Sequence, residues 1–324
     1  MPGFVGHAFL SIGIVLLTAT GFVFAQPGPS LQNSEAKPGS TTPSYSMRVE
    51  VPLVTLDATV LTQDGFFVPE LKKENFRIFE DGIEQKIASL GEVTAPVTAV
   101  LLVEFSDGTF ALQQNALQAC YQFTKALQPN DWAALVFFDK RPTVIQDFTQ
   151  DKSALQEALV SPRVPLSREI NLFDALDDTL DRLRQVDGRK YIILMATGQD
   201  TFSKKILDEV YRKIESANDT IIYSVDTGLG LHQLQADNQM RVFARMTGGR
   251  FYFASSLDEY NDLYRDPAHS IRNRYTLTYR PIHHGRDGKW HKVRLQVINP
   301  DANGHNRKYQ VVVREGYRAA TPVK

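Results

Sequence analysis

Apolar and polar residues follow three different patterns along this chain. From residue 47 to about 92 they alternate, and the dipeptides Asp64-Gly65 and Asp81-Gly82 are typical of hairpin turns. Alternation returns from residue 271 to 318. Because a strand with one face in the core alternates in this way, both stretches predict small antiparallel β units. In the second hairpin, we expect residues 76–78 and 83–87 to form the two arms.

The stretch between these units has a different pattern. Short, continuous apolar runs are separated by segments in which apolar residues recur at helical spacing. Continuous runs are typical of parallel strands that are buried on both faces, so residues 96–270 predict a doubly wound, mostly parallel α/β domain. The predicted strands are 97–103, 132–138, 143–148, 191–196, 220–225 and 250–254, and the predicted helices lie at 112–127, 172–183, 206–217, 240–246 and 257–270.

Neither β unit has enough strands for a stable sheet of its own. We therefore expect the units at 47–92 and 271–318 to pair into one β-sandwich-like module, with the α/β domain inserted between them. Residues 319–324 are left as a short tail.

The first 46 residues follow none of these patterns. The apolar run at 8–25 ends with Val23 and Ala25 at the −3 and −1 positions of a signal-peptidase site. Residues 1–25 therefore predict a signal peptide, and with it export to the periplasm, the cell envelope or the medium. An uncleaved membrane anchor is the alternative, because the run nearly reaches spanning length. Residues 26–46 are rich in Pro, Ser and Gly and predict a flexible linker.

Composition narrows the classes of function. The chain is 43% hydrophobic and 23% charged, as globular proteins are, and its net charge of −1 gives no basic field for nucleic acid. The single cysteine, Cys120, cannot form an internal disulfide and falls on an apolar helical face, so we expect a buried thiol. No Ser-His-Asp order and no Gly-x-Ser-x-Gly motif is present, and we predict that the protein is not an enzyme.

A polar or acidic residue directly follows four predicted strands: Glu104, Asp139, Thr197 and Asp226. The carboxyl ends of parallel strands meet at one edge of a sheet, so these residues predict a cation or partner site there. Strands that run out into solvent would give the same pattern. A hydrolase that uses two of these carboxylates is a further alternative, although nothing in the sequence places two of them together.

Two other clusters have simpler interpretations. His283, His284 and His291 could hold a metal ion, but they flank a glycine-rich turn, where solvated histidines are commoner than ligands. Four aspartates on the predicted helix 172–183 are interpreted as a solvated acidic face: Asp174, Asp177, Asp178 and Asp181.

Several short motifs occur in a recognisable order. They are "EFSDGT" after the first parallel strand, then "NLFDAL", "YIILMATGQDT", "RMTGGRFYFA", "YTLTYRP" and "REGY". In these motifs the chain resembles the von Willebrand factor type A family over roughly residues 47–318. It most closely resembles the exported bacterial VWFA-related proteins of the kind seen in acidobacteria. The resemblance implies a protein-binding or adhesion function.

The resemblance also implies where a metal site would be. The family's metal-ion-dependent adhesion site holds Mg²⁺ with Asp-x-Ser-x-Ser, a Thr from a second loop and an Asp from a third. Here Glu104 stands in place of the first Asp, Ser106 matches the first Ser, and Gly108 replaces the second. Thr197 replaces the Asp of the third loop.

In the second loop, Ile170 falls where the Thr is expected, with Asn171 beside it. The resemblance therefore implies a degenerate site without a cofactor, and a protein partner whose identity the sequence does not give. Asp107, Thr109 and Asp200 are nearby oxygens that could rebuild a Mg²⁺ site with Glu104 and Ser106, and this alternative predicts Mg²⁺-dependent adhesion. Contact with a membrane is expected only through an uncleaved N-terminus.

Overall fold

The computed structural model describes residues 53–92, 95–107, 113–160, 167–227, 234–253, 270–282, 287–299 and 305–321. The predicted signal peptide, the predicted linker and the predicted helix at 257–270 lie outside the described residues. Within these ranges, no helix is both long enough and apolar enough to cross a bilayer.

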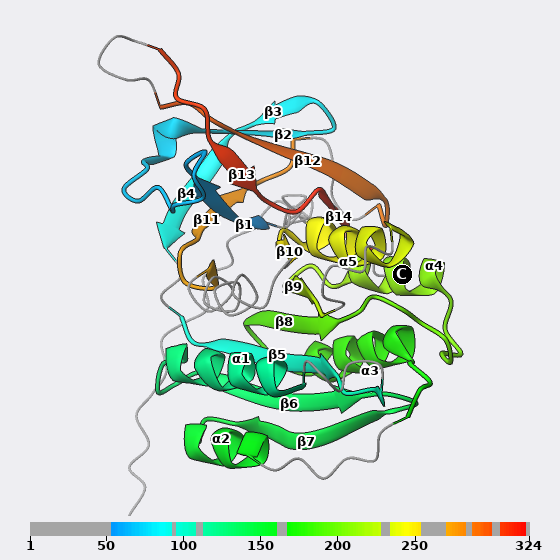
Figure 1. The fold of residues 1–324 in the computed structure, drawn as a ribbon. Coiled ribbons are helices and arrows are strands. Elements are labelled where there is room, and N and C mark those ends of the chain that lie inside the picture. The colour runs from blue at the N-terminus through cyan, green and yellow to red at the C-terminus, as the bar shows by residue number, and fades with distance from the viewer. Residues whose placement is uncertain are drawn as a thin grey trace, which may run out of the picture. The chain divides into compact units, whose positions relative to one another are not determined.

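A six-stranded sheet forms the centre of the α/β part, with the strand order β10-β9-β8-β5-β6-β7 (Figure 1). All neighbouring pairs are parallel except β6 and β7, so β7 is an antiparallel edge strand. The predicted doubly wound, mostly parallel sheet is confirmed. Its strands are β5 (Val97–Glu104), β6 (Trp132–Phe138), β7 (Pro142–Thr149), β8 (Arg189–Ala196), β9 (Thr220–Asp226) and β10 (Phe251–Tyr252).

Helices cover both faces of this sheet. All eight residues of β5 are buried, and its alternate side chains belong to two separate apolar clusters. The cluster on one face includes residues of α1 and α2, and the cluster on the other face includes residues of α3, α4 and α5. This double cover explains why β5 is a continuous apolar run. The helices are α1 (Gln113–Ala126), α2 (Lys152–Val160), α3 (Leu172–Arg184), α4 (Leu207–Ser216) and α5 (Leu234–Thr247).

Two four-stranded antiparallel sheets form the β module, in the orders β13-β1-β11-β4 and β14-β12-β2-β3. Each sheet combines strands from both ends of the chain, because β1 pairs with β11 and β2 pairs with β12. Side chains of both sheets share one apolar cluster, as expected for a sandwich. The strands are β1 (Val54–Leu61), β2 (Phe76–Glu80), β3 (Ile83–Gln85), β4 (Ile87–Glu92), β11 (Tyr275–Tyr279), β12 (Trp290–Val297), β13 (Gln310–Val312) and β14 (Gly316–Arg318).

Some elements differ from the sequence-based predictions. Ile87 does not continue the second hairpin: β3 ends at Gln85, and Ile87 begins β4, which pairs with β11 in the other sheet. The sequence does not predict α2, which is short and buries only Leu155 and Leu159. It also does not predict the three-residue strand β14. The predicted domain boundaries stay predictions.

Buried arginines join strands of the β module to the central sheet. Arg189, at the start of β8, donates to both carboxylate oxygens of Asp57 in β1, at 3.0 and 3.2 Å, and to Thr276 in β11 at 2.6 Å. The buried Arg274 donates to the Tyr223 hydroxyl in β9 and to the Asp57 carbonyl. A planar guanidinium can serve several acceptors at once, so these two side chains fix β1 and β11 against β8 and β9.

We expect the Cys120 thiol to be unreactive in the folded chain. Cys120 is fully buried in α1, and burial raises the pKa of its thiol to about 12, so almost no thiolate is present near neutral pH. A thiol-specific disulfide reagent should label the native chain very slowly and the guanidinium-unfolded chain fully. Rapid labelling of the native chain would contradict the burial of this face of α1.

Candidate functional site

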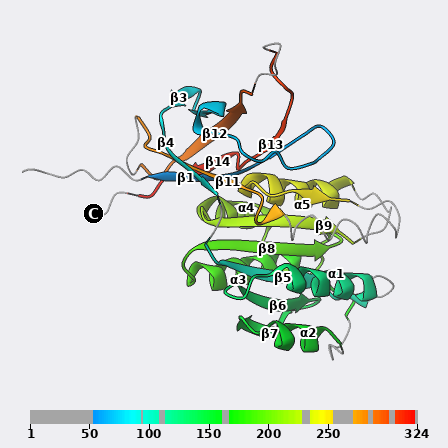
Figure 2. The same cartoon turned by 90° about the vertical axis from the view of Figure 1, so that its left-hand side faces the viewer.

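The parallel strands all end at one edge of the six-stranded sheet, which we call the C-terminal edge (Figure 2). Three loops meet there. Loop 1 follows β5 (residues 105–107), loop 2 precedes α3 (residues 167–171), and loop 3 follows β8 (residues 197–206). The described residues that correspond to the family's metal site lie in these loops or at the end of β5, whereas Asp139 follows β6 and Asp226 ends β9. Gly108 and Thr109 lie outside the described residues.

The carboxylate of Glu104 bridges the ends of two neighbouring strands. Glu104 ends β5 and is only 2% exposed. Its Oε1 accepts a hydrogen bond from Ser106 Oγ at 2.7 Å, and its Oε2 accepts hydrogen bonds from the backbone N–H and the hydroxyl of Thr197, both at 2.8 Å. Because Thr197 directly follows β8, this side chain ties loop 1 to loop 3 without an intervening ion.

Burial raises the pKa of the Glu104 carboxyl. The hydrogen bonds from Thr197 and Ser106 act in the opposite direction, but the desolvation of the charge is larger. The folded state therefore holds the proton more tightly than the unfolded state. The contribution of this group to stability is full below the unfolded pKa and is lost as the pH rises through the raised folded pKa.

Loop 2 is fixed to loop 3 through backbone groups. Ile170 is buried, and its carbonyl accepts the N–H groups of Thr201 and Phe202 at 2.8 and 2.9 Å. The Ile170 N–H in turn donates to the Thr201 hydroxyl at 2.9 Å. The N–H of Asn171 donates to the carbonyl of Asp139, just after β6, at 2.8 Å, whereas the buried Asn171 Oδ1 has no hydrogen-bond partner.

The other two predicted carboxylates have separate partners. Asp107 forms an exposed ion pair with Arg168 at 3.0 Å. Asp200 accepts hydrogen bonds from the N–H of Phe173 at 3.1 Å and from Ser203 Oγ at 2.5 Å. Phe173 lies in the first turn of α3, whose N–H groups have no acceptors within the helix, so Asp200 caps α3 from loop 3.

These residues do not fit the family's Mg²⁺ site. Octahedral coordination needs converging oxygens, but Ile170 supplies none, and both Glu104 oxygens already accept hydrogen bonds. Asn171 Oδ1 is one oxygen without a partner, and Asp200 is held at α3. In the described ranges, no three His, Cys, Asp or Glu side chains come together as a metal would require.

In the predicted histidine cluster, His291 forms salt bridges. The buried His291 lies between Asp81, 2.8 Å from Nδ1, and Asp287, 3.1 Å from Nε2. Burial lowers the pKa of His291, but the hydrogen bonds to the two carboxylates outweigh it and the net shift is upward. Both ring nitrogens are therefore engaged by carboxylates, while His283 and His284 lie outside the described residues.

The acidic face of α3 is solvated only in part, because its aspartates also have basic or backbone partners. Lys213 of α4 lies 2.7 Å from Asp177 and 2.6 Å from Asp181. Asp174 accepts the backbone N–H groups of loop 3 at Lys204 and Lys205. Three of the aspartates therefore join α3 to α4 and to loop 3, while Asp178 pairs with Arg182 within α3. The partners in α4 and loop 3 could not be predicted, because they are distant along the chain.

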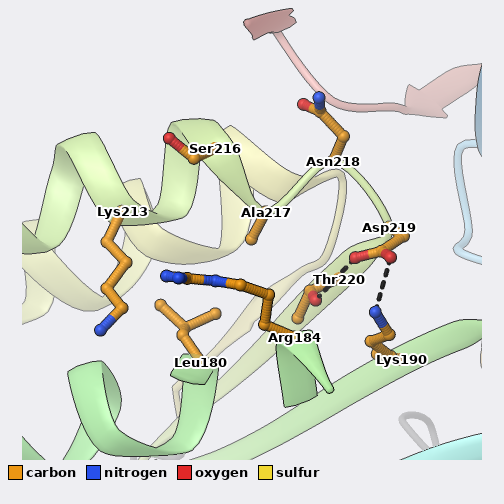
Figure 3. Close-up of a pocket in the computed structure, with 9 residues that line it drawn as sticks. All are labelled: Leu180, Arg184, Lys190, Lys213, Ser216, Ala217, Asn218, Asp219 and Thr220. Carbon is orange, nitrogen blue, oxygen red and sulfur yellow. Dashed lines mark hydrogen bonds and ion pairs between the residues drawn. The ribbon is translucent and has the colours of Figure 1, made fainter. Parts of the chain in front are cut away.

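A cavity of about 220 Å³ lies beyond the C-terminal ends of α3 and α4, away from the three loops (Figure 3). Three cations line it, and each already has a carboxylate partner. Lys190 pairs with Asp219 at 2.6 Å, Arg184 pairs with Asp181, and Lys213 pairs with Asp177 and Asp181. The cavity therefore has no uncompensated charge to attract an anion.

A larger cavity, of about 510 Å³, lies at the C-terminal edge between loop 3 and the first turn of α5. Gln239 of α5 donates to the Gly198 carbonyl at 3.0 Å and holds the two walls together. Three large apolar residues at or near this cavity are exposed to solvent: Phe202 is 44% exposed, Ile206 60% and Leu234 83%. This apolar surface was not predicted, because its residues are not among the polar residues that follow the strands.

Comparison with known proteins shows similarity in structure only. No family model matches the sequence, and no curated protein is similar to it. Several solved structures are similar in fold. A von Willebrand factor type A protein from Catenulispora acidiphila is 11% identical, with 76% of each chain covered and a TM-score of 0.45.

Two further solved structures each cover just over half of this chain. The von Willebrand factor domain of the type V pili tip protein Mfa5 from Porphyromonas gingivalis is 15% identical and has a TM-score of 0.44, covering 55% of this chain and 96% of that one. The conserved hypothetical protein BatB from Bacteroides thetaiotaomicron is 12% identical with the same TM-score, covering 54% and 97%. The finer resemblance, to acidobacterial exported proteins, stays a prediction.

We expect Glu104→Gln to stabilise the chain at alkaline pH. Glutamine keeps the shape and removes the buried charge, so its unfolding midpoint should exceed that of the wild type near pH 8, and the difference should close as the pH falls toward 4.5. A difference of about 2–4 °C corresponds to roughly 1 kcal/mol in a domain of this size.

Glu169→Gln is the matched control, because Glu169 lies in loop 2 but is half-exposed and paired with Lys140 at 2.9 Å. It should change the midpoint little at any pH. A Glu104→Gln variant that is less stable than the wild type at every pH would show that burial of the Glu104 carboxylate does not destabilise the folded chain.

Proposed function

We propose that this protein is an exported, non-enzymatic protein-binding module whose binding face is the C-terminal edge of the six-stranded sheet. We further propose that this face needs no metal ion. The observation that carries the proposal is the Glu104 carboxylate, which joins loops 1 and 3 directly where the family's site would use an ion.

The loops are already ordered with respect to one another. Glu104 joins loop 1 to loop 3, the Ile170 carbonyl joins loop 2 to loop 3, and Asp200 joins loop 3 to α3. A face that is fixed before binding loses little conformational entropy when a partner docks. Direct hydrogen bonds therefore supply the preorganisation that a metal ion would otherwise provide.

The surface near these loops has the composition of an interface. Phe202 and Leu234 are exposed apolar side chains, and the 510 Å³ cavity lies beside Leu234. Charged residues surround them: Lys140 lies over the Phe202 ring at 4.8 Å and pairs with Glu169. An apolar centre with a charged rim is typical of protein interfaces and supports a protein partner rather than a nucleic acid or a membrane.

The alternative functions have less support. A hydrolase would need a carboxylate free to act as acid or base, whereas both oxygens of Glu104 accept hydrogen bonds inside the protein. Mg²⁺-dependent adhesion has less support because Ile170 supplies no side-chain oxygen and Oδ1 of Asp200 already accepts two hydrogen bonds. Export is proposed from the apolar segment at 1–25 and its small residues before Gln26.

We expect partner capture to depend on the exposed apolar residues and not on Mg²⁺. The immobilised chain is incubated with cell-envelope extract in EDTA and, separately, in Mg²⁺, and the captured proteins are identified by mass spectrometry. The same partner should be retained in both buffers. Phe202→Asp and Leu234→Asp should each weaken its capture at least about tenfold, since a buried hot-spot residue contributes more than 1.4 kcal/mol.

Val160→Asp is the matched control. Val160 ends α2 and is 78% exposed, about as much as Leu234, but it is not at the C-terminal edge. This variant should capture the partner as the wild type does, and all three variants should keep the wild-type unfolding midpoint. Capture that requires Mg²⁺, or equal capture by all variants, would overturn the proposed face.

A further inference from the structure

Arg314 is a buried cation that has no carboxylate partner among the described residues. It follows β13 and is only 5% exposed. Its Nε donates to the Gly316 carbonyl at 2.6 Å, and its Nη1 donates to the Asn218 carbonyl. Its Nη2 is buried and has no hydrogen-bond partner. Burial lowers the pKa of Arg314 to about 10, so the guanidinium is still charged at neutral pH.

The acids around Arg314 are already neutralised by other cations. Asp57 accepts two hydrogen bonds from Arg189, and Asp219 pairs with Lys190 at 2.6 Å. The next arginine along the chain, Arg318, pairs with Glu215 at 2.5 Å. Each of these pairs is neutral, so within the described residues the charge of Arg314, like that of the buried Arg274, has no carboxylate partner.

Arg314 lines a cavity of about 310 Å³ between the first residues of β1, the last residues of β14 and the turn before β9. Much of the lining is apolar and comes from the β module: Leu53, Val54, Tyr317, Ala319 and Ala320. A buried charge is costly unless a counter-charge and a full set of hydrogen bonds accompany it. Arg314 is among the residues that line this cavity, which has room for a small molecule.

We propose that this cavity binds the carboxylate of a ligand with a short aliphatic chain, and that Arg314 is the cation that holds it. A carboxylate carries one negative charge, which would balance the charge of Arg314, and its oxygens can accept from a guanidinium in one plane. The apolar walls suit the aliphatic part. A doubly charged phosphate would leave one charge unpaired beside Asp219.

Binding can be measured by saturation-transfer NMR on the full chain with sodium hexanoate as the probe. Hexan-1-ol has the same chain length without the charge and serves as the neutral control. We expect hexanoate to give a saturable signal that excess acetate competes away, and hexanol to bind at least about tenfold more weakly. Equal binding of the two probes would overturn the proposal, whatever the variants show.

Two variants from the same cavity test the residue. Arg314→Gln should lower hexanoate binding at least about tenfold, whereas Arg318→Gln should leave it within about twofold, because Arg318 already pairs with Glu215. Loss in both variants, or in neither, would contradict the assignment to Arg314. Circular dichroism shows whether Arg314→Gln folds. If it does not, the comparison of hexanoate with hexanol on the wild-type chain decides the test.

The carboxylate could belong to a free acid or to the C-terminus of a peptide. A pentapeptide that ends in Leu is therefore tested beside its C-terminal amide. Tighter binding of the free-acid peptide than of hexanoate points to a protein terminus, and tighter binding of hexanoate points to a small acid. Equal binding of peptide acid and peptide amide, together with equal binding of hexanoate and hexanol, contradicts both sources.

Discussion

The arrangement of the C-terminal edge depends on one buried carboxylate. Glu104 is one methylene longer than aspartate, and this length lets its two oxygens accept hydrogen bonds from Ser106 in loop 1 and from Thr197 in loop 3. The bridge desolvates a charge, and the three donors offset part of that cost. Once loops 1 and 3 are joined, loop 3 positions loop 2 through Ile170 and caps α3 through Asp200.

The two ends of the chain are held by a second group of polar contacts. Strands from both ends pair in each sheet of the sandwich, so each sheet depends on both ends of the chain. Arg189 and Arg274 then fix β1 and β11 to the central sheet. The same junction contains Arg314, whose charge has no carboxylate partner among the described residues. The proposed binding face and the proposed carboxylate site therefore lie in different parts of the chain and can be tested separately.

The sequence was most informative where one physical signal dominated. Strands such as β5 and β9 are continuous apolar runs because helices cover them on both faces, and the first half of β1 alternates because only one of its faces is buried there. Short elements with little burial, such as α2, carry no such signal. The crossing of β4 into the other sheet also could not be predicted, because pairing with β11 connects residues that are far apart in sequence.

The sequence predicted where the residues of the candidate site lie, but not which atoms form hydrogen bonds. Glu104, Ser106 and Thr197 follow buried strands, so their convergence at one edge follows from the parallel sheet. Which atoms bond to which depends on side-chain length and on loop geometry. Asp200 therefore looked like a possible metal ligand in the sequence, although it caps α3 in the structure. Arg314 had no signal at all, because its isolation depends on the partners of Asp57, Asp219 and Glu215.

The most direct test of a metal-independent C-terminal edge is the thermal unfolding of the wild-type chain in EDTA and then in millimolar Mg²⁺ or Mn²⁺. An ion that binds only the native state must raise the midpoint, by about 2.7 kcal/mol of stability at a hundred times its dissociation constant. The account predicts the same midpoint in all three solutions. A midpoint that rises with Mg²⁺ or Mn²⁺, and no longer does so in Ser106→Ala, would show that the loops hold an ion and would contradict it.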